Sequence, residues 1–135
     1  MNFRYANEND YNYIQENDIY LAQGLISMKI KNNEIILIEQ EKITVGWLRF
    51  GYFWDNIPFM NMLWINEEYR SKGIGKEITL FWENEMKNKN FRMVMTSTLS
   101  NEDAQHFYRK LGYKDVGGLL LENEPLEILL IKNLS

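Results

Sequence analysis

The residues that most directly indicate a binding function lie in one basic, glycine-rich segment, Arg70-Ser-Lys-Gly-Ile-Gly-Lys76. A nearly continuous apolar run, residues 59–65, precedes it, as expected of a strand that is buried on both faces. Apolar residues at helical spacing follow, so the glycines lie where a strand passes into a helix. Glycines at such a place let backbone N–H groups approach an anion, and a helix N-terminus adds roughly half a positive charge. Arg70, Lys72 and Lys76 would add mobile positive charge. The segment therefore predicts a binding site for a pyrophosphate.

Two better-known phosphate-binding loops do not fit this segment. A P-loop requires glycine where the chain has Arg70, and serine or threonine after the lysine, where the chain has Glu77. A dinucleotide-binding fingerprint requires a third glycine at the position of Ile78. The remaining alternative is a helix start whose glycines and surface cations serve only for capping.

A second stretch, residues 101–113, predicts a short helix with one unusual residue on its buried side. Ser100 or Asn101 can cap its N-terminus, and Gly112 is well placed for the left-handed residue that ends a helix. The hydroxyl of Tyr108 would need a partner inside the protein or in a ligand. Four residues at positions i, i+3, i+4 and i+7 form the stripe that we expect to be buried: Ala104, Phe107, Tyr108 and Leu111.

Together the two segments resemble the GNAT superfamily of acyl-CoA N-acyltransferases. The family's loop after the fourth strand reads Arg/Gln-x-x-Gly-x-Gly/Ala, and here it reads Arg70-Ser-Lys-Gly73-Ile-Gly75. A later family segment commonly reads Asn-x-x-Ala-x-x-Phe-Tyr-x-Lys-x-Gly-Phe/Tyr. The residues that match it are Asn101, Ala104, Phe107, Tyr108, Lys110, Gly112 and Tyr113. The motifs cover residues 59–113, whereas the flanks agree in the order of strands and helices.

The resemblance implies that acyl-CoA lies in a cleft between the fourth and fifth strands, with its pyrophosphate on residues 70–76. The backbone of residues 63–65 would pair with the pantetheine amides, much as a peptide strand pairs. Asn101 would contact the pantetheine arm or order the cleft, and Tyr108 would be the catalytic acid for the departing thiolate. The residues that the resemblance implies in cofactor binding are Leu63, Trp64, Ile65, Arg70, Ser71, Lys72, Gly73, Ile74, Gly75, Lys76, Asn101, Ala104 and Phe107.

The activity implied by the resemblance is that of an acetyl-CoA-dependent N-acetyltransferase. It would move an acetyl group directly to a primary amine of a small molecule or peptide, with no metal and no covalent enzyme intermediate. A backbone N–H near residues 63–65 would polarise the thioester carbonyl. A non-catalytic acyl-CoA-binding or sensing module is the alternative. Many relatives place a Glu in or near the fourth strand, whereas residues 59–65 contain no carboxylate.

No residue stands out as the general base. Glu67 and Glu68 follow the strand and Asp55 lies in a loop, so a solvated or capping role is favoured over a catalytic one for each of them. An α-amine with a pKa of about 8 is roughly one-tenth neutral at pH 7, whereas a lysine near 10.4 is neutral only about once in 2,000. We therefore expect the acceptor to be an α-amine or another amine of low pKa.

A group of aromatic residues allows two interpretations. They either line the acceptor pocket or pack in the core, as aromatic residues in strands usually do. The group consists of Trp47, Phe50, Tyr52, Phe53 and Trp54.

The order of elements predicts an α/β (α+β) fold in a single domain over residues 1–135. We expect a mixed, mostly antiparallel sheet of six to seven strands with helices on both faces, which the resemblance also implies. The expected strands are 3–5, 34–39, 43–53, 59–65, 91–98, 116–122 and 127–131, and the expected helices are 7–16, 19–29, one from residue 74 and one from residue 101. We expect residues 55–58, which end in Pro58, to break the strand pattern.

Composition agrees with a small enzyme. A length of 135 residues is typical of one domain, and a net charge of −4 argues against a nucleic-acid partner. The absence of cysteine excludes disulfides, a thiol nucleophile and thiolate metal sites. No apolar run approaches the roughly 20 residues that span a membrane, and the N-terminus lacks a signal peptide, so we expect a cytoplasmic protein with no membrane partner. The oligomeric state is left open, a homodimer included.

Overall fold

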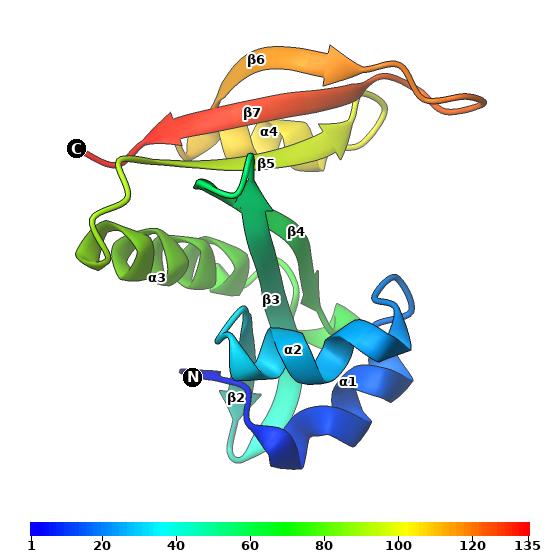
Figure 1. Cartoon of the computed structure of the whole chain (residues 1–135), viewed down its shortest axis with the longest axis vertical. Coiled ribbons are helices and arrows are strands. Elements are labelled where there is room, and N and C mark those ends of the chain that lie inside the picture. The colour runs from blue at the N-terminus through cyan, green and yellow to red at the C-terminus, as the bar shows by residue number, and fades with distance from the viewer. The chain divides into compact units, whose positions relative to one another are not determined.

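Seven strands form one sheet in the order β1-β2-β3-β4-β5-β7-β6 in the computed structural model, which describes residues 1–135 (Figure 1). The strands are β1 (Asn2–Tyr5), β2 (Ile35–Gln40), β3 (Ile43–Phe53), β4 (Ile57–Ile65), β5 (Met93–Leu99), β6 (Lys114–Leu119) and β7 (Glu127–Asn133). The β4–β5 pair is parallel, whereas the pairs β1–β2, β2–β3, β5–β7 and β6–β7 are antiparallel. The predicted mixed, mostly antiparallel sheet is confirmed.

Four α-helices accompany the sheet. They are α1 (Tyr11–Asn17), α2 (Ile26–Lys31), α3 (Ile74–Asn88) and α4 (Ala104–Lys110). Three 3-10 segments, η1 (Glu8–Asp10), η2 (Gln23–Leu25) and η3 (Glu67–Tyr69), precede α1, α2 and α3 in the chain. None of these helices combines the length and the apolar character that crossing a membrane requires.

The chain divides into two compact units. The first unit contains residues 1–50 and 62–78, and the second contains residues 51–61 and 79–135. Three elements, β3, β4 and α3, contribute residues to both units. The single-domain organisation expected from the sequence stays a prediction.

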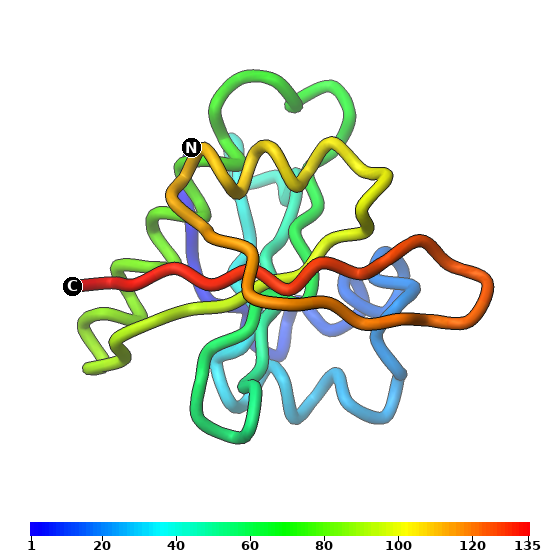
Figure 2. The backbone as a smooth tube through the Cα atoms, turned by 90° about the horizontal axis from the view of Figure 1, so that it is seen from above, coloured from blue at the N-terminus to red at the C-terminus, as the bar shows by residue number.

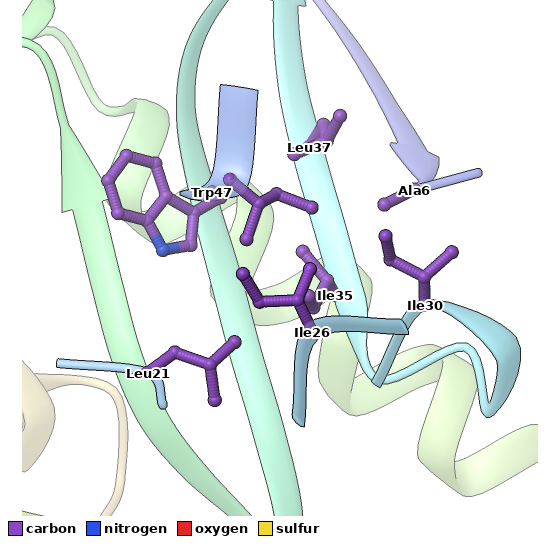
Figure 3. Packing of buried hydrophobic residues seen from close by; sticks show 8 residues of the cluster. Ala6, Leu21, Ile26, Ile30, Ile35, Leu37 and Trp47 are labelled. Atoms are coloured by element: carbon purple, nitrogen blue, oxygen red, sulfur yellow. The ribbon is translucent and has the colours of Figure 1, made fainter. Parts of the chain in front are cut away.

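Buried apolar side chains from α1, α2, β2 and β3 form the core of the first unit. Figure 3 shows Ile26 and Ile30 of α2 beside Ile35 of β2. Residues 35–38 are at most 1% exposed, which explains why an unbroken run of Ile and Leu forms this strand. Truncating a core side chain of this size to alanine typically costs about 2–5 kcal/mol, so this cluster stabilises the first unit.

A β-bulge at Val45 brings β3 very close to the end of β4. The register of β3 against β2 skips Val45, so this residue has no partner of its own in β2. Its carbonyl instead accepts a hydrogen bond from the N–H of Asn66, at 2.8 Å. A Cβ at Gly46 would overlap the carbonyl oxygen of Trp64. Glycine is therefore required at position 46.

A buried ion pair ties the connection between α1 and α2 to β3. The Asp18 side chain is only 1% exposed, and its Oδ2 accepts hydrogen bonds from Arg49 Nε at 2.7 Å and from Trp47 Nε1 at 3.2 Å. Its Oδ1 accepts from the backbone N–H of Tyr20 at 3.2 Å. Because a buried charge is tolerated only when it is paired and hydrogen-bonded, these contacts fix the path of this connection.

In the second unit, β7 lies between β5 and β6, and α4 packs against β5. Figures 1 and 2 show β6 (orange) and β7 (red) running side by side. Trp82 and Met86 of α3, Val94 of β5 and Leu130 of β7 are completely buried. All residues of β6 are exposed, as expected of a strand at the edge of the sheet.

Some predicted boundaries are wrong. The second helix begins at Ile26 rather than at residue 19, because a 3-10 segment precedes it. The strand β4 begins at Ile57 and includes Pro58, which we expected to interrupt the pattern. Proline is tolerated close to the start of a strand, where a ladder hydrogen bond is not needed. The edge strand β6 covers 114–119 instead of 116–122.

The expectation that β4 is buried on both faces is also wrong. Only Pro58 and Met60 are fully buried, whereas Asn61 is exposed and Trp64 is 44% exposed. The reason is that the parallel pairing of β4 with β5 consists of only two residue pairs, Phe59 with Met95 and Met60 with Thr96. An apolar run alone does not reveal where a strand loses its neighbour.

We predict that Gly46→Ala destabilises the protein by about 1–3 kcal/mol, because the added methyl group overlaps the Trp64 carbonyl and the backbone must shift. Urea unfolding monitored by tryptophan fluorescence measures the change. The matched control is Gly24→Ala, since a Cβ at Gly24 meets no atom within 4 Å. Equal midpoints for the two variants would contradict this interpretation of the bulge.

A second stability prediction concerns Asp18→Asn. This change leaves the Arg49 guanidinium, with a side-chain exposure of 8%, as an unpaired buried charge, so the free energy of unfolding should fall by about 3–5 kcal/mol. Adding Arg49→Met should restore part of the loss. The control is Asp115→Asn, which breaks a pair exposed to solvent and should leave the unfolding midpoint nearly unchanged. A similar loss in both single variants would refute the prediction.

Candidate functional site

The glycine-rich loop of the first unit lies between η3 and the first turn of α3. Ser71 and Gly73 both have positive φ angles, of 60° and 84°, and the helix starts at Ile74. Left-handed residues in such a loop turn neighbouring N–H groups toward one side, where they can receive an anion. The hydrogen bond from Glu77 N–H to Gly73 O, at 3.1 Å, connects the loop directly to the helix. The predicted passage from strand to helix is thus confirmed.

The space beside Gly73 is open. A Cβ built at this position would meet no atom within 4 Å, so the chain itself does not require a small residue there. Its φ of 84° lies in the left-handed region, which glycine adopts without steric cost. The loop therefore leaves room for a ligand to approach the backbone, as a pyrophosphate site requires.

The positive charges of the loop are held in two different ways. Arg70 is fixed on β4, because its Nε donates to the carbonyl oxygen of Ile65 at 2.6 Å and its guanidinium stacks 4.5 Å from the Trp64 ring centre. It is therefore not the mobile charge that we expected. Lys72 and Lys76 are exposed, and Lys72 Nζ lies 5.7 Å from the ring centre of Tyr69.

The end of β4 supplies the backbone that was predicted to meet the pantetheine arm. Leu63 and Ile65 are partly buried, and the Trp64 ring packs at 6.3 Å from that of Trp47. The Ile65 carbonyl already accepts from Arg70, although a carbonyl oxygen has a second lone pair. The first unit thus brings together residues 63–65 and 70–76.

Tyr108 is the central side chain among the candidate site residues of the second unit. It is 7% exposed, and its hydroxyl donates to Met60 Sδ at 3.5 Å, so the predicted burial and the predicted need for a partner are both confirmed. The Thr96 hydroxyl donates to the Met60 carbonyl oxygen at 3.0 Å. A thioether sulfur is a weak acceptor, so a stronger one can replace it at little cost.

Burial raises the pKa of Tyr108 to about 12, and the contact with the Thr96 hydroxyl opposes this rise only partly. The neutral phenol is therefore stable at physiological pH. Its pKa lies well above the value of about 8.5 for a thiol, so the phenol can give up its proton only as a thiolate forms beside it.

A buried network supports the ring of Tyr108. Tyr113 packs edge-on against it, with ring centres 5.5 Å apart, and the Tyr113 hydroxyl donates to Glu83 Oε2 at 2.8 Å. Lys132 Nζ donates to Glu83 Oε1 at 2.7 Å. Burial raises the pKa of Tyr113, and the neighbouring Glu83 carboxylate raises it further. Sequence reasoning missed Met60, Thr96 and Glu83, because only the fold brings them to Tyr108 and Tyr113.

The start of α4 differs from its prediction. Asp103 occupies the N-cap position without a side-chain cap, in place of Ser100 or Asn101. Gln105 Nε2 donates instead to the carbonyl oxygens of Ser100 and Glu102. At the other end, Gly112 has a φ of 100°, which confirms the predicted left-handed residue.

Only part of the predicted stripe on α4 is buried. Tyr108 is buried, Phe107 and Leu111 are partly buried, and Ala104 is exposed, like Asn101 ahead of the helix. The helix has only seven residues, and none of the side chains in its first turn is fully buried. The second unit therefore holds Asn101, Ala104, Phe107 and Tyr108 on one short segment.

The carboxylates considered as bases remain at the surface. Glu67 and Glu68 in η3 are exposed, as is Asp55, which has a φ of 61° in the turn between β3 and β4. Residues 57–65 of β4 contain no carboxylate. No group of three or more histidine, aspartate or glutamate side chains is placed to hold a metal ion.

The aromatic residues of β3 and the turn after it separate into two groups. Trp47 and Phe50 are buried, at 5% and 0% exposure, which confirms the core interpretation for them. Tyr52 and Phe53 instead line a hollow of the second unit. Trp54, at the turn after β3, is 75% exposed and packs on Phe53 with ring centres 4.7 Å apart.

Solved structures with the same fold include several acetyltransferases. Ard1 from Thermoplasma volcanium superposes with a TM-score of 0.82 at 15% identity, covering 98% of this chain and 96% of that one. The yncA protein of Salmonella typhimurium, solved with its cofactor acetyl-CoA, gives 0.81 at 13% identity over 100% and 94%. Naa50 from Arabidopsis thaliana, in complex with the bisubstrate analogue CoA-Ac-MVNAL, gives 0.79 at 16% identity over 97% of each chain. At these identities the likeness establishes the fold.

Family membership rests on a sequence comparison. A comparison with curated proteins found no match. The model of the acetyltransferase (GNAT) family, however, matches residues 3–113, which include both the glycine-rich loop and the segment around Tyr108. The resemblance seen in the sequence is thereby confirmed, and the chain belongs to the GNAT family of acetyltransferases.

Proposed function

We propose that this protein is an acetyl-CoA-dependent N-acetyltransferase that transfers an acetyl group directly to a primary amine of a small molecule or peptide. The observation that carries the proposal is the loop before α3. Its left-handed Ser71 and Gly73 stand at the start of a 15-residue helix, beside open space and exposed lysines. Helix N-termini of this kind bind phosphate groups. The yncA structure with acetyl-CoA and the Naa50 structure with a bisubstrate analogue support it.

Acetyl-CoA would supply the activated acetyl group as a thioester. The pyrophosphate would rest on the backbone of residues 70–76, with Lys72 and Lys76 as exposed counter-charges and Arg70 held ready on β4. Leu63, Trp64 and Ile65 would offer backbone groups to the pantetheine amides, and an N–H among them would polarise the carbonyl. Asn101, Ala104 and Phe107 would contribute from the segment that leads into Tyr108.

Tyr108 would protonate the leaving sulfur. The acceptor nitrogen bonds to the acetyl carbon, and the carbon–sulfur bond breaks with its electron pair on sulfur. Sulfur then takes the proton of the Tyr108 hydroxyl, while the nitrogen loses a proton that returns through water to the tyrosine. In the free protein this hydroxyl donates to Met60 Sδ, so it is already directed toward a sulfur atom. Such assistance contributes about 10²–10⁴ in rate.

The acceptor would react as the neutral fraction of the amine that is already present in solution. Since β4 contains no carboxylate and the carboxylates nearby in sequence are exposed, no side chain stands out to remove a proton before attack. This favours an α-amine, or another amine whose pKa is near 8, which is roughly one-tenth neutral at pH 7.

The first prediction concerns cofactor binding. Gly73→Asp should weaken acetyl-CoA binding at least about tenfold in calorimetric titration, because the carboxylate repels a phosphate and fills the open space. Gly73→Asn, which fills the same space without charge, should lose less. Gly24→Asp, whose new side chain also meets open space, should bind like the wild type. If Gly73→Asp binds normally, the loop is a helix start and no more.

The second prediction concerns the proton donor. Tyr108→Phe should lower kcat by about 10²–10⁴ and leave the Kd for acetyl-CoA unchanged, whereas Tyr20→Phe, at a tyrosine that is 76% exposed, should change neither. Since the pKa of Tyr108 is raised to about 12, the wild-type rate should not decline up to about pH 10, where an ordinary tyrosine of pKa about 10 would be half ionised. An unchanged kcat in Tyr108→Phe would contradict the proposed role. Binding of acetyl-CoA without acetylation of any amine would identify a non-catalytic acyl-CoA-binding module instead.

A further inference from the structure

A hollow of about 290 Å³ opens on the surface of the second unit. Its walls are mainly apolar, and its lining contains no charged side chain. The rings of Phe53 and Phe59 lie almost parallel, with their centres 6.1 Å apart. The lining residues that matter for recognition are Phe53, Phe59, Leu119, Leu129, Asn61 and Ser97.

The strand register places these side chains on one face of the sheet. Phe59 pairs with Met95, so the side chains of Phe59 and Asn61 share a face with that of Ser97, two residues beyond Met95. Ser97 pairs with Leu129 in the neighbouring strand, which therefore points to the same side. These lining side chains therefore point to the same face because side chains alternate between the two faces along each strand.

The hollow reaches the end of the β4–β5 pairing, where Tyr108 lies on the opposite face. The last residue pair is Met60 with Thr96, and Asn61 and Ser97 follow immediately. The Met60 side chain points away from the hollow and accepts the Tyr108 hydroxyl. Met60, which the proposed acid contacts, is therefore directly adjacent in β4 to the lining residues Phe59 and Asn61.

We propose that this hollow binds the acceptor, and that the acceptor is a primary amine carrying an uncharged, apolar body the size of one large side chain. This inference rests on the proposed acetyl transfer. The body would pack against the rings of Phe53 and Phe59 and against the two leucines, while the Asn61 amide oxygen and the Ser97 hydroxyl accept hydrogen bonds from the amine.

Charge and size both restrict the acceptor. A second ammonium group buried in the hollow would find no carboxylate among the lining residues, so diamines and lysine-like bodies are disfavoured. Small-molecule sites usually measure about 300–1,000 Å³, and this hollow is at the lower limit of that range. A single aromatic or branched aliphatic group fits this description. It belongs either to a free small amine or to the first residue of a peptide.

A series of amides with the same α-amine tests the substrate class. We expect kcat/KM for phenylalaninamide to exceed that for glycinamide by about 10–200-fold, since apolar groups in a fitted pocket discriminate on this scale. Lysinamide should be no better than glycinamide. The peptide Phe-Ala-Ala-Ala distinguishes the two sources, because a peptide enzyme will prefer it to phenylalaninamide. A preference for lysinamide or glycinamide would overturn the inference.

Two variants test whether the hollow is responsible. Leu119→Glu introduces a carboxylate at a lining residue, whereas Leu120→Glu introduces one at the neighbouring residue, which is 92% exposed and outside the hollow. Leu119→Glu should lower the preference for phenylalaninamide over lysinamide at least about tenfold, and Leu120→Glu should leave it unchanged. Asn61→Asp, at an exposed position, should shift the preference in the same direction. Equal effects of Leu119→Glu and Leu120→Glu would contradict the assignment.

Ligand binding separates this inference from the proposed reaction. Phenylalaninamide titrated into the protein by NMR should shift resonances of the second unit, and Leu119→Glu should weaken this binding while Leu120→Glu does not. If the protein binds phenylalaninamide in this way but transfers no acetyl group, the hollow is confirmed and the catalytic proposal fails. If the enzyme acetylates other amines and phenylalaninamide does not bind, the catalytic proposal stands and the hollow is not its acceptor site.

Discussion

The short parallel pairing of β4 with β5 is the constraint on which the surroundings of Tyr108 in the second unit depend. Two residue pairs join the strands, and the pairing ends at Met60 and Thr96. Met60 accepts two side-chain hydrogen bonds at this end. Its carbonyl oxygen accepts from the Thr96 hydroxyl, and its sulfur accepts from the Tyr108 hydroxyl. A longer pairing would have used the same backbone groups for the sheet. The place where the ladder stops is therefore where side chains and ligands can act.

A different constraint shapes the first unit. The bulge at Val45 and the close approach at Gly46 set the position of the end of β4, from which the chain passes through η3 into the glycine-rich loop. Asn66, the first residue after β4, is held by the Val45 carbonyl. The loop that would receive a pyrophosphate is thus anchored at its start by strand geometry, and at its end by the first turn of α3. The first anchor lies outside the family motif, whereas the second uses the motif's Gly73, whose carbonyl oxygen accepts from Glu77 N–H.

Local signals in the sequence were sufficient to predict the two motifs and most of the helices and strands. The spacing of glycines and apolar residues predicted the start of α3, and Gly112 predicted the end of α4, because both features depend on backbone conformation close in sequence. Tyr108 was found because it lies at helical spacing from other apolar residues. The residues that surround it were not, since Met60, Thr96 and Glu83 come from distant elements.

The wrong expectations share one physical cause. Apolar residues in β4 and along α4 predicted burial, but burial also requires a neighbour on that side. Asn61 and Trp64 of β4 are exposed, and so is Ala104 in the first turn of α4. Pro58 was taken to break the strand, although it stands at the second residue, where proline is acceptable. Tertiary neighbours, which no short stretch of sequence reports, decided each of these points.

The fixed position of Arg70 has a consequence for how tightly an anion could be held. An exposed arginine normally loses rotational freedom when a ligand immobilises it, at a cost of about 0.5–1.5 kcal/mol. Here the Ile65 carbonyl and the Trp64 ring have already ordered the side chain, so that entropy is lost when the protein folds. The two exposed lysines would still lose theirs on binding. The loop is therefore partly preorganised, with its guanidinium ordered in advance and its ammonium groups left free to adapt.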